Sequence, residues 1–170
     1  MSLRSITKYG ESVLRKKAEP VQDLGPDIQK LILDMYDTMY AANGVGLAAP
    51  QVGISLRLAV INVTPDKRNR QFVIINPKIL SREGKAEAEE GCLSLPGVGG
   101  AAFKRSAKVV VEALNEQGLP ITITADGLLA RCLQHEIDHL EGKLIIHRAS
   151  LKRQWEMRWA IRKLKKEDLW

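Results

Sequence analysis

Residues 126–141 constrain the fold of this 170-residue chain most strongly. As a helix, this segment carries leucines and a cysteine on more than one face, and a helix that is apolar all round is buried in a core. Asp126 is its expected N-cap and Gly142 its expected stop. The same segment also contains four titratable side chains, namely His135, Glu136, Asp138 and His139. The sequence therefore predicts a buried central helix that takes titratable groups into the core.

The rest of the chain indicates an α+β fold. Apolar residues at helical spacing, with Pro26 in the first turn and Asn43 near the end, predict a helix over residues 26–42. Runs of strand character lie at residues 56–63, 71–76, 86–92, 109–114 and 121–124. Strands in succession, without regular alternation with helices, indicate one α+β domain. In it, antiparallel sheets pack around the buried helix and another helix ends the chain.

Residues 44–51 carry no hydrophobic periodicity and are rich in glycine and alanine. We expect a loop here. Its small side chains would let the main chain pass close to another group.

His135 and His139 predict a metal site, because side chains four residues apart on a helix lie one above the other and can bind one ion. Glu136 projects about 100° round the helix from His135. It could reach a water on the metal without itself binding the ion. The alternative is a pair of histidines with ordinary hydrogen-bond partners. Burial weakens that alternative, since two imidazoles and a carboxylate inside a core need strong partners.

A catalytic metal site needs a third protein ligand and an open position. The metalloprotease patterns fit poorly. Ile145 stands where one pattern needs a third histidine, and the downstream acids Glu156 and Glu167 lie in a strongly basic segment. Cys92, at the end of a strand run, fits better. A thiolate with two imidazoles suits Fe(II) or Zn(II).

Three segments together resemble the peptide deformylase family. Residues 44–51 (GVGLAAPQ), 90–94 (EGCLS) and 134–140 (QHEIDHL) stand in the order, and at about the spacing, of that family's three motifs. The similarity extends over nearly the whole chain. It implies a metal-dependent hydrolase that removes the N-formyl group from the N-terminal formylmethionine of newly synthesised polypeptides and releases formate.

The resemblance implies a role for each matching residue. The family's metal ligands match Cys92, His135 and His139. Glu136 matches the general acid and base, which would take a proton from the attacking water and deliver it to the leaving amine. The side chain of Gln51 and the backbone N–H of Leu93 match the groups that stabilise the oxyanion. The main chain at Gly46 is implied to contact the substrate.

The same resemblance places Cys132 beside the pocket for the methionine side chain, with Val45 and Leu128 as further candidates. Cys132 also lies on the same face of the helix as His135, which makes it a possible metal ligand. We interpret it as an apolar wall, because free cysteine behaves as a small hydrophobe. The family points to one divalent ion per chain, with Fe2+ as the native metal. Zn2+, Ni2+ or Co2+ could occupy the site in preparations.

Three features leave alternatives open. Asp138 could hold a ligand histidine or form a surface salt bridge. His147 falls beyond the helix and is expected near the surface. Residues 97–102 contain only glycine, valine and alanine, where many relatives carry an arginine soon after the proline. We expect a flexible loop there, with weaker contact to longer peptide substrates.

We interpret residues 1–150 as the catalytic domain and residues 151–170 as a basic C-terminal helix of the same domain. Seven basic and three acidic residues give this tail a charge of +4, which leaves +2 of the formal +6 for the rest of the chain. The resemblance implies that the helix docks on the ribosome near the nascent-chain exit, where Lys and Arg would contact phosphate. The alternative is a solvated helix that packs Trp155 and Trp159 onto the body.

Composition excludes several classes of protein. Two cysteines are too few for a disulfide scaffold. No apolar run approaches the ~20 residues that span a bilayer, and the N-terminus lacks the pattern of a signal or transit peptide. We expect a monomeric enzyme of the bacterial cytoplasm, with reduced thiols and no membrane partner.

Two other functions remain open from the residues alone. A zinc endopeptidase with the His-Glu-x-x-His motif would use the same helix with a different third ligand. A binding module would hold a structural metal and act through its basic tail. Glu136 argues against the binding module, because a structural site needs no acid–base group beside an open coordination position.

Overall fold

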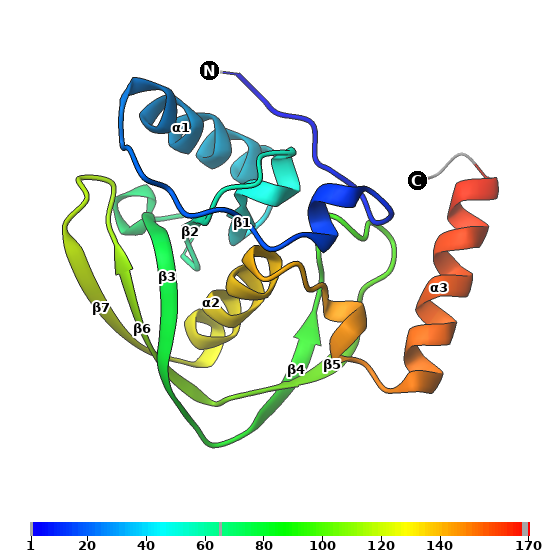
Figure 1. Cartoon of the computed structure of the whole chain (residues 1–170). Helices are drawn as coiled ribbons and strands as arrows, with labels where there is room; N and C mark the ends of the chain where they lie inside the picture. The colour runs from blue at the N-terminus through cyan, green and yellow to red at the C-terminus, as the bar shows by residue number, and fades with distance from the viewer. Residues whose placement is uncertain (1, 65, 168–169) are drawn as a thin grey trace.

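The computed structural model describes residues 2–64, 66–167 and 170 (Figure 1). The helices in this part of the chain are α1 (Pro26–Ala41), α2 (Gly127–Leu140) and α3 (Leu151–Lys166). Short 3-10 helices are η1 (Ser12–Arg15), η2 (Ala49–Val52), η3 (Arg68–Arg70) and η4 (Ile145–Arg148). The strands are β1 (Gly46–Ala48), β2 (Leu58–Ile61), β3 (Phe72–Glu83), β4 (Ala86–Glu90), β5 (Ala101–Arg105), β6 (Lys108–Leu114) and β7 (Pro120–Asp126).

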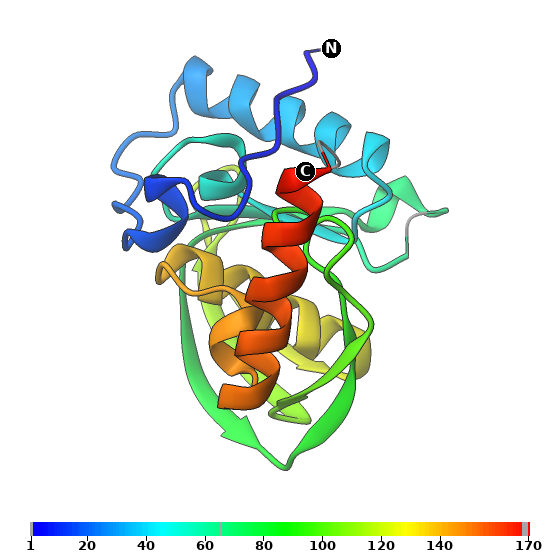
Figure 2. The same cartoon turned by 90° about the vertical axis from the view of Figure 1, so that its right-hand side faces the viewer.

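Two antiparallel sheets surround α2. Five strands pair in the order β1–β2–β3–β6–β7, and β4 pairs with β5 in a separate hairpin. The register of β3 against β6 shifts twice, and such bulges bend a strand. Figures 1 and 2 show the strands curving around α2, with α1 on the opposite side of the molecule from the turn that joins β3 and β4. The predicted α+β class is confirmed.

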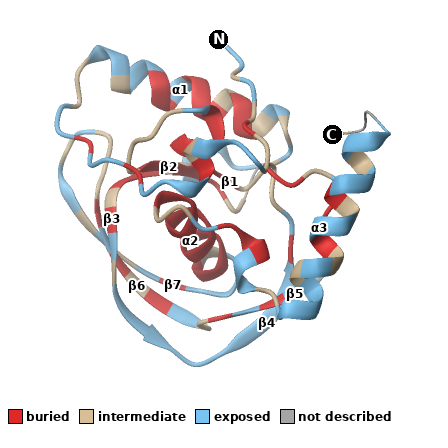
Figure 3. Ribbon diagram, turned by 45° about the vertical axis from the view of Figure 1, so that its right-hand side comes forward, coloured by how far each residue is buried: buried red, intermediate tan, exposed pale blue. Residues whose placement is uncertain are grey.

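The central helix is buried as predicted from its second turn onward. Residues 130–140 of α2 are all buried, whereas Leu128 in the first turn is 53% exposed (Figure 3). The apolar side of the helix packs against strands of the five-stranded sheet through Ala130, Leu133, Ile137 and Leu140. Asp126 occupies the N-cap position but makes no capping hydrogen bond with its side chain. The polar residues of α2 thus lie on buried positions.

Helix α1 covers a second core beside β1 and β2. Pro26 begins the helix, and Leu31, Met35 and Met39 bury its inner face. The helix ends one residue before the predicted boundary. Asn43 then takes a left-handed backbone conformation, with φ 53°, which turns the chain into β1.

Two segments predicted as irregular contain strands. The expected loop at residues 44–51 includes β1 and η2, and the expected flexible loop after Pro96 includes β5. The sequence does not predict these two strands, because glycine and alanine have low strand propensity. Strand β3 also runs well past the predicted residue 76, where its pairing with β6 holds side chains that are mostly exposed. None of the helices in the described residues is long and apolar enough to cross a membrane.

Helix α3 packs on the body through a different face from the one considered in the sequence. Met157 and Ile161 are buried in a third apolar cluster with Phe103 and Ile146. Trp155 and Trp159 are 67% and 57% exposed, so the interpretation that they pack onto the body is wrong. Four residues separate Met157 from Ile161, and this second i, i+4 pair lies on the opposite side of the helix.

The packing of α3 predicts a contrast between neighbouring substitutions. Met157→Ala should lower the free energy of unfolding by about 2–5 kcal/mol, because it opens a cavity in the third cluster. Trp155→Ala, which removes a larger but exposed side chain, should change it by no more than about 0.5 kcal/mol. Urea unfolding of both variants measures the difference. Equal losses would contradict this account of how the helix is held.

Candidate active site

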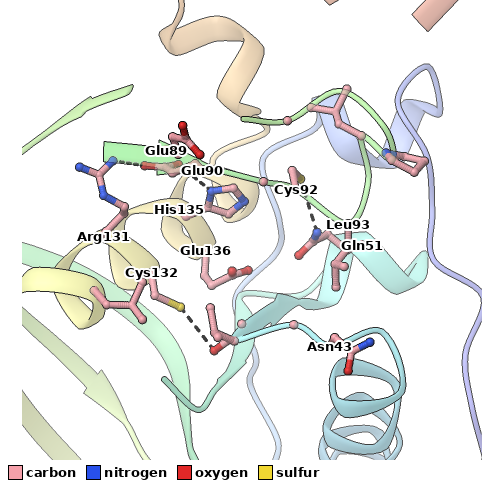
Figure 4. Close-up of a pocket in the computed structure, with 18 of the residues that line it drawn as sticks. Asn43, Gln51, Glu89, Glu90, Cys92, Leu93, Arg131, Cys132, His135 and Glu136 are labelled. Atoms are coloured by element: carbon pink, nitrogen blue, oxygen red, sulfur yellow. Dashed lines mark hydrogen bonds and ion pairs between the residues drawn. The ribbon is translucent and has the colours of Figure 1, made fainter. Parts of the chain in front are cut away.

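A pocket of about 430 Å³ opens between α2, β1 and the residues that follow β4. Figure 4 shows its lining side chains, with His135, Glu136 and Cys132 rising from α2 and Cys92 opposite them. The pocket brings together nine of the ten predicted site residues, which are Val45, Gly46, Gln51, Cys92, Leu93, Leu128, Cys132, His135 and Glu136. The tenth, His139, lies beside the pocket in contact with His135 and Cys92.

Three predicted metal ligands converge on one point. Sγ of Cys92 lies 3.4 Å from Nε2 of His139, and the same nitrogen lies 3.2 Å from Nε2 of His135. All three ligand atoms are within 4.8 Å of one another. The helix supplies the two imidazoles because residues four apart share a face. The third donor comes from the turn after β4.

A carboxylate outside the predicted site residues, that of Glu90, orients the imidazole of His135. Nδ1 of His135 lies 3.0 Å from Oε2 of Glu90, so the proton on Nδ1 is donated to Glu90. Nε2 of His135 then faces Nε2 of His139 at 3.2 Å, a separation that suits a shared proton or a bound cation between the two nitrogens.

Glu90 itself is buried and receives several donors. Arg105 donates to both carboxylate oxygens at 2.9 Å, and Arg131 donates to Oε1 at 2.6 Å. Burial favours the neutral acid, but the hydrogen bonds from Arg105 and His135 outweigh it and hold the pKa of Glu90 well below its usual range. A signal for this arrangement was present in the sequence. Arg131 precedes His135 by one helical turn, on the same buried face.

Asp138 takes neither of the roles considered for it. Its carboxylate is buried and pairs with Arg105 and Arg148 rather than with a ligand histidine. Burial raises its pKa, and the two arginines more than reverse this effect. Arg105 is thus fully engaged by acidic partners and is not free to meet a peptide. His147 is exposed, as expected.

Glu136 is held in place without a full set of partners. Its side chain is buried, and Oε2 has no hydrogen-bond partner among the described residues. Burial raises the pKa of Glu136 to about 7. A carboxyl group with such a pKa can both accept and release a proton near neutral pH.

Gln51 and Leu93 present donors to the same side of the pocket. Oε1 of Gln51 accepts from the N–H of Ala48 at 2.9 Å, which directs its Nε2 toward Ser94 Oγ at 3.4 Å and Cys92 Sγ at 3.8 Å. The N–H of Leu93 has no acceptor among the described residues. The N–H of Leu93 is therefore free to donate to a ligand oxygen, and the longer contacts of Gln51 Nε2 place a second donor beside Cys92.

Cys132 contacts the wall of the pocket rather than the cluster of donors. Its thiol donates to the carbonyl of Val45 at 3.5 Å, and burial raises its pKa well above the usual value. A thiol that stays protonated is a poor metal ligand. This geometry favours the apolar-wall interpretation.

The donor set fits a divalent cation. One thiol and two imidazole nitrogens converge, and Oε2 of Glu136, a buried oxygen without a partner among the described residues, belongs to the same pocket. A cation would take the place of a proton between the two imidazole nitrogens. Cys92, His135 and His139 are the residues that would hold it.

Comparison with known proteins decides the family. A sequence profile described as polypeptide deformylase matches residues 3–155. The chain belongs to the polypeptide deformylase family. It is 51% identical over 156 residues to a peptide deformylase from Thermodesulfovibrio yellowstonii, covering 91% of this chain and 94% of that protein. A crystal structure of a peptide deformylase from Legionella pneumophila superposes with a TM-score of 0.93 at 48% identity, covering 98% of both chains.

A second relative extends over the whole chain. A peptide deformylase from Neisseria gonorrhoeae is 43% identical over 169 residues and covers 99% of this chain and 100% of that protein. The family predicted from the three motifs is confirmed, and the chain is an enzyme. The individual roles of the pocket residues stay predictions.

In this deformylase, Gly46 is where β1 passes closest to the site. A Cβ atom at this position would lie 2.4 Å from Oε1 of Glu136 and 2.8 Å from Sγ of Cys132. Both distances are shorter than real contacts allow. Only glycine therefore lets β1 and α2 approach this closely with Glu136 in its present position.

Gly46→Ala should reduce deformylase activity on the order of 100-fold, because displacing a reacting group by about 1 Å has that effect. The measurement is formate release from a formyl-Met peptide. Gly25→Ala is the matched control, since a Cβ there meets only the carboxylate of Asp23 on the surface. Full activity of Gly46→Ala in a folded protein would contradict the proposed position of Glu136.

Proposed function

We propose that this deformylase hydrolyses the N-formyl group of N-terminal formylmethionine with one divalent ion held by Cys92, His135 and His139. Glu136 would act as general acid and base. Removal of the formyl group from nascent peptides is the activity of the family to which the chain belongs. The observation that carries the finer proposal is the buried Oε2 of Glu136, which has no partner in the described residues beside three converging metal donors.

The reaction adds water to the formyl carbon and breaks the bond to the amine. Glu136 would accept a proton from the attacking water and return it to the amine as the C–N bond breaks. A bound divalent ion would supply a Lewis acid that polarises the formyl oxygen and makes water more acidic. Nε2 of Gln51 and the N–H of Leu93 would donate to that oxygen as negative charge develops. Losing one such donor typically costs about 3 kcal/mol of transition-state stabilisation.

Fe2+ is proposed as the native ion. One thiolate and two imidazoles are soft to borderline ligands, which suit Fe(II), Zn(II), Co(II) and Ni(II) rather than Mg(II) or Ca(II). Zn2+, Ni2+ or Co2+ would then occupy the site in preparations. The thiolate must stay reduced to bind, which supports a location in the reducing bacterial cytoplasm. We also propose that the chain acts as a monomer.

The methionine side chain would occupy the apolar part of the pocket. Val45, Leu128 and Cys132 line this part, and the main chain of Gly46 lies beside Glu136. An extended peptide could lie along β1, the edge strand of the five-stranded sheet. The alternative of a zinc endopeptidase is not favoured, since the third donor in the structure is Cys92 and the family match is to deformylases.

Glu136→Gln separates metal binding from turnover. The variant should retain its metal, because Glu136 is not a ligand, and should release formate from formyl-Met-Ala-Ser roughly 10²–10⁴-fold more slowly. Anaerobically purified protein is assayed for formate and for metal content. The unformylated peptide, followed for peptide-bond cleavage, is the control for peptidase activity. Unchanged turnover would exclude Glu136 as the proton carrier.

We further propose that α3 docks on the ribosome. Leu151, Trp155 and Trp159 share the exposed face of the helix, opposite the buried Met157 and Ile161. Exposed cations accompany them at Lys152, Arg162, Lys163 and Lys166. Basic side chains interleaved with aromatic rings suit an RNA surface, through phosphate contact and base stacking.

Charge reversal tests ribosome docking without disturbing the core. Replacing Lys152, Arg162, Lys163 and Lys166 together by glutamate should abolish co-sedimentation with ribosomes at low salt. The buried face of α3 is unchanged in this variant, so the helix should stay in place. The control reverses four exposed cations elsewhere, namely Lys16, Lys67, Arg70 and Lys85. Equal loss in both variants would indicate non-specific attraction, and unchanged co-sedimentation of the α3 variant would refute docking through this helix.

A further inference from the structure

The hairpin of β4 and β5, which leads to Cys92, has little apolar contact of its own. Glu90, Phe103 and Arg105 are its buried side chains among those that the structure describes, and the other four residues of β4 are exposed. Apolar burial therefore does little to fix the end of β4 against α2. On the far side of Cys92, Leu95 and Val98 are buried with Phe103 in the third apolar cluster, so apolar packing holds the turn after Cys92. The end of β4, before Cys92, depends on polar contacts.

Arg131 of α2 makes the hydrogen bonds that connect this helix to the β4–β5 hairpin. Its Nη1 donates to Oε1 of Glu90 at 2.6 Å and to the carbonyl of Phe103 at 2.9 Å. Its Nη2 donates to the carbonyl of Ala86 at 3.2 Å. One planar guanidinium thus binds both strands of the hairpin and the carboxylate that stands two residues before Cys92. Figure 4 shows Arg131 facing Glu90.

Glu90 makes a second connection to α2, through His135. Its Oε2 accepts from Nδ1 of His135, while Arg105 donates to both of its oxygens. Two guanidinium groups fix the plane of the carboxylate. The acceptor for His135 is therefore immobile, and the imidazole is held with Nε2 toward Cys92 and His139.

We propose that Arg131 is a positioning residue for the metal centre, which fixes Glu90 and the β4–β5 hairpin to α2 so that the donors of Cys92, His135 and His139 stay together and a bound ion is retained. The inference rests on the proposed metal site. It requires an arginine, since a lysine ammonium at the same place lacks the planar fork that reaches Glu90 and both strand carbonyls.

Removing Arg131 should therefore affect metal retention more than the fold. Glu90 would keep its donors Arg105 and His135, so no carboxylate is left buried without a partner. Gln134→Met is the matched control. Gln134 also ties α2 to the segment after β5, through two hydrogen bonds of 3.0 Å to the main chain of Ser106, but it touches neither Glu90 nor a metal donor.

The experiment loads wild-type protein, Arg131→Met, Arg131→Lys and Gln134→Met with Zn(II), then follows its release to an excess of a chromogenic chelator. Loss of a group that orients metal ligands typically weakens binding 10–100-fold. We expect Zn(II) release to be faster by about this factor in Arg131→Met. Arg131→Lys should recover part of the difference, and Gln134→Met should stay within about threefold of wild type. Thermal unfolding of the metal-free proteins records any general loss of stability.

A wild-type release rate in Arg131→Met, or an equal increase in Gln134→Met, would overturn the inference. If Arg131→Met does not fold, Arg131→Lys tests the inference instead. Zn(II) release at the wild-type rate in that variant would contradict the need for a forked donor. Failure of the wild-type protein to bind Zn(II) at all would instead refute the proposed metal site and function. The two failures are therefore distinguishable.

Discussion

The hydrogen bond between Glu90 and His135 links the two parts of the chain on which the site depends. Burying α2 takes His135, Glu136, Asp138 and His139 away from water, and each must find a partner in the core or be left at a cost of several kcal/mol. Glu90 serves His135, and Arg105 with Arg148 serves Asp138. Oε2 of Glu136, which has no partner among the described residues, lies in the pocket.

This division of partners explains how one helix can be both core and active site. The arginines that compensate Glu90 and Asp138 leave those carboxylates ionised and fully bonded, so they take no part in proton transfer. Glu136, on the next face of the helix, makes no ion pair with these arginines, and burial outweighs the charges of His135 and Arg105 and raises the pKa of Glu136 to about 7. Gly46 then sets the distance from β1 to that carboxylate, because no larger residue fits.

The sequence predicted the buried helix, the fold class and the residues that converge on the pocket, since helical periodicity and motif spacing are local signals. It failed where tertiary contacts decide. Strands β1 and β5 are assembled from glycine- and alanine-rich segments by pairing with β2 and β4. The exposed face of α3 could not be distinguished from the buried one, because Trp155 and Met157 both start plausible i, i+4 pairs. The partner of His135 was missed for the same reason, as a carboxylate 45 residues away leaves no local pattern.

In the proposed metal site, Cys92 from the turn after β4 completes a ligand set built on α2. X-ray absorption at the metal edge of the Zn(II)-loaded protein tests it most directly. We expect one sulfur scatterer at about 2.3 Å with two imidazole nitrogens at about 2.0–2.1 Å, and loss of the sulfur contribution in Cys92→Ser. A shell of nitrogen and oxygen alone, or a sulfur contribution that survives Cys92→Ser, would contradict it.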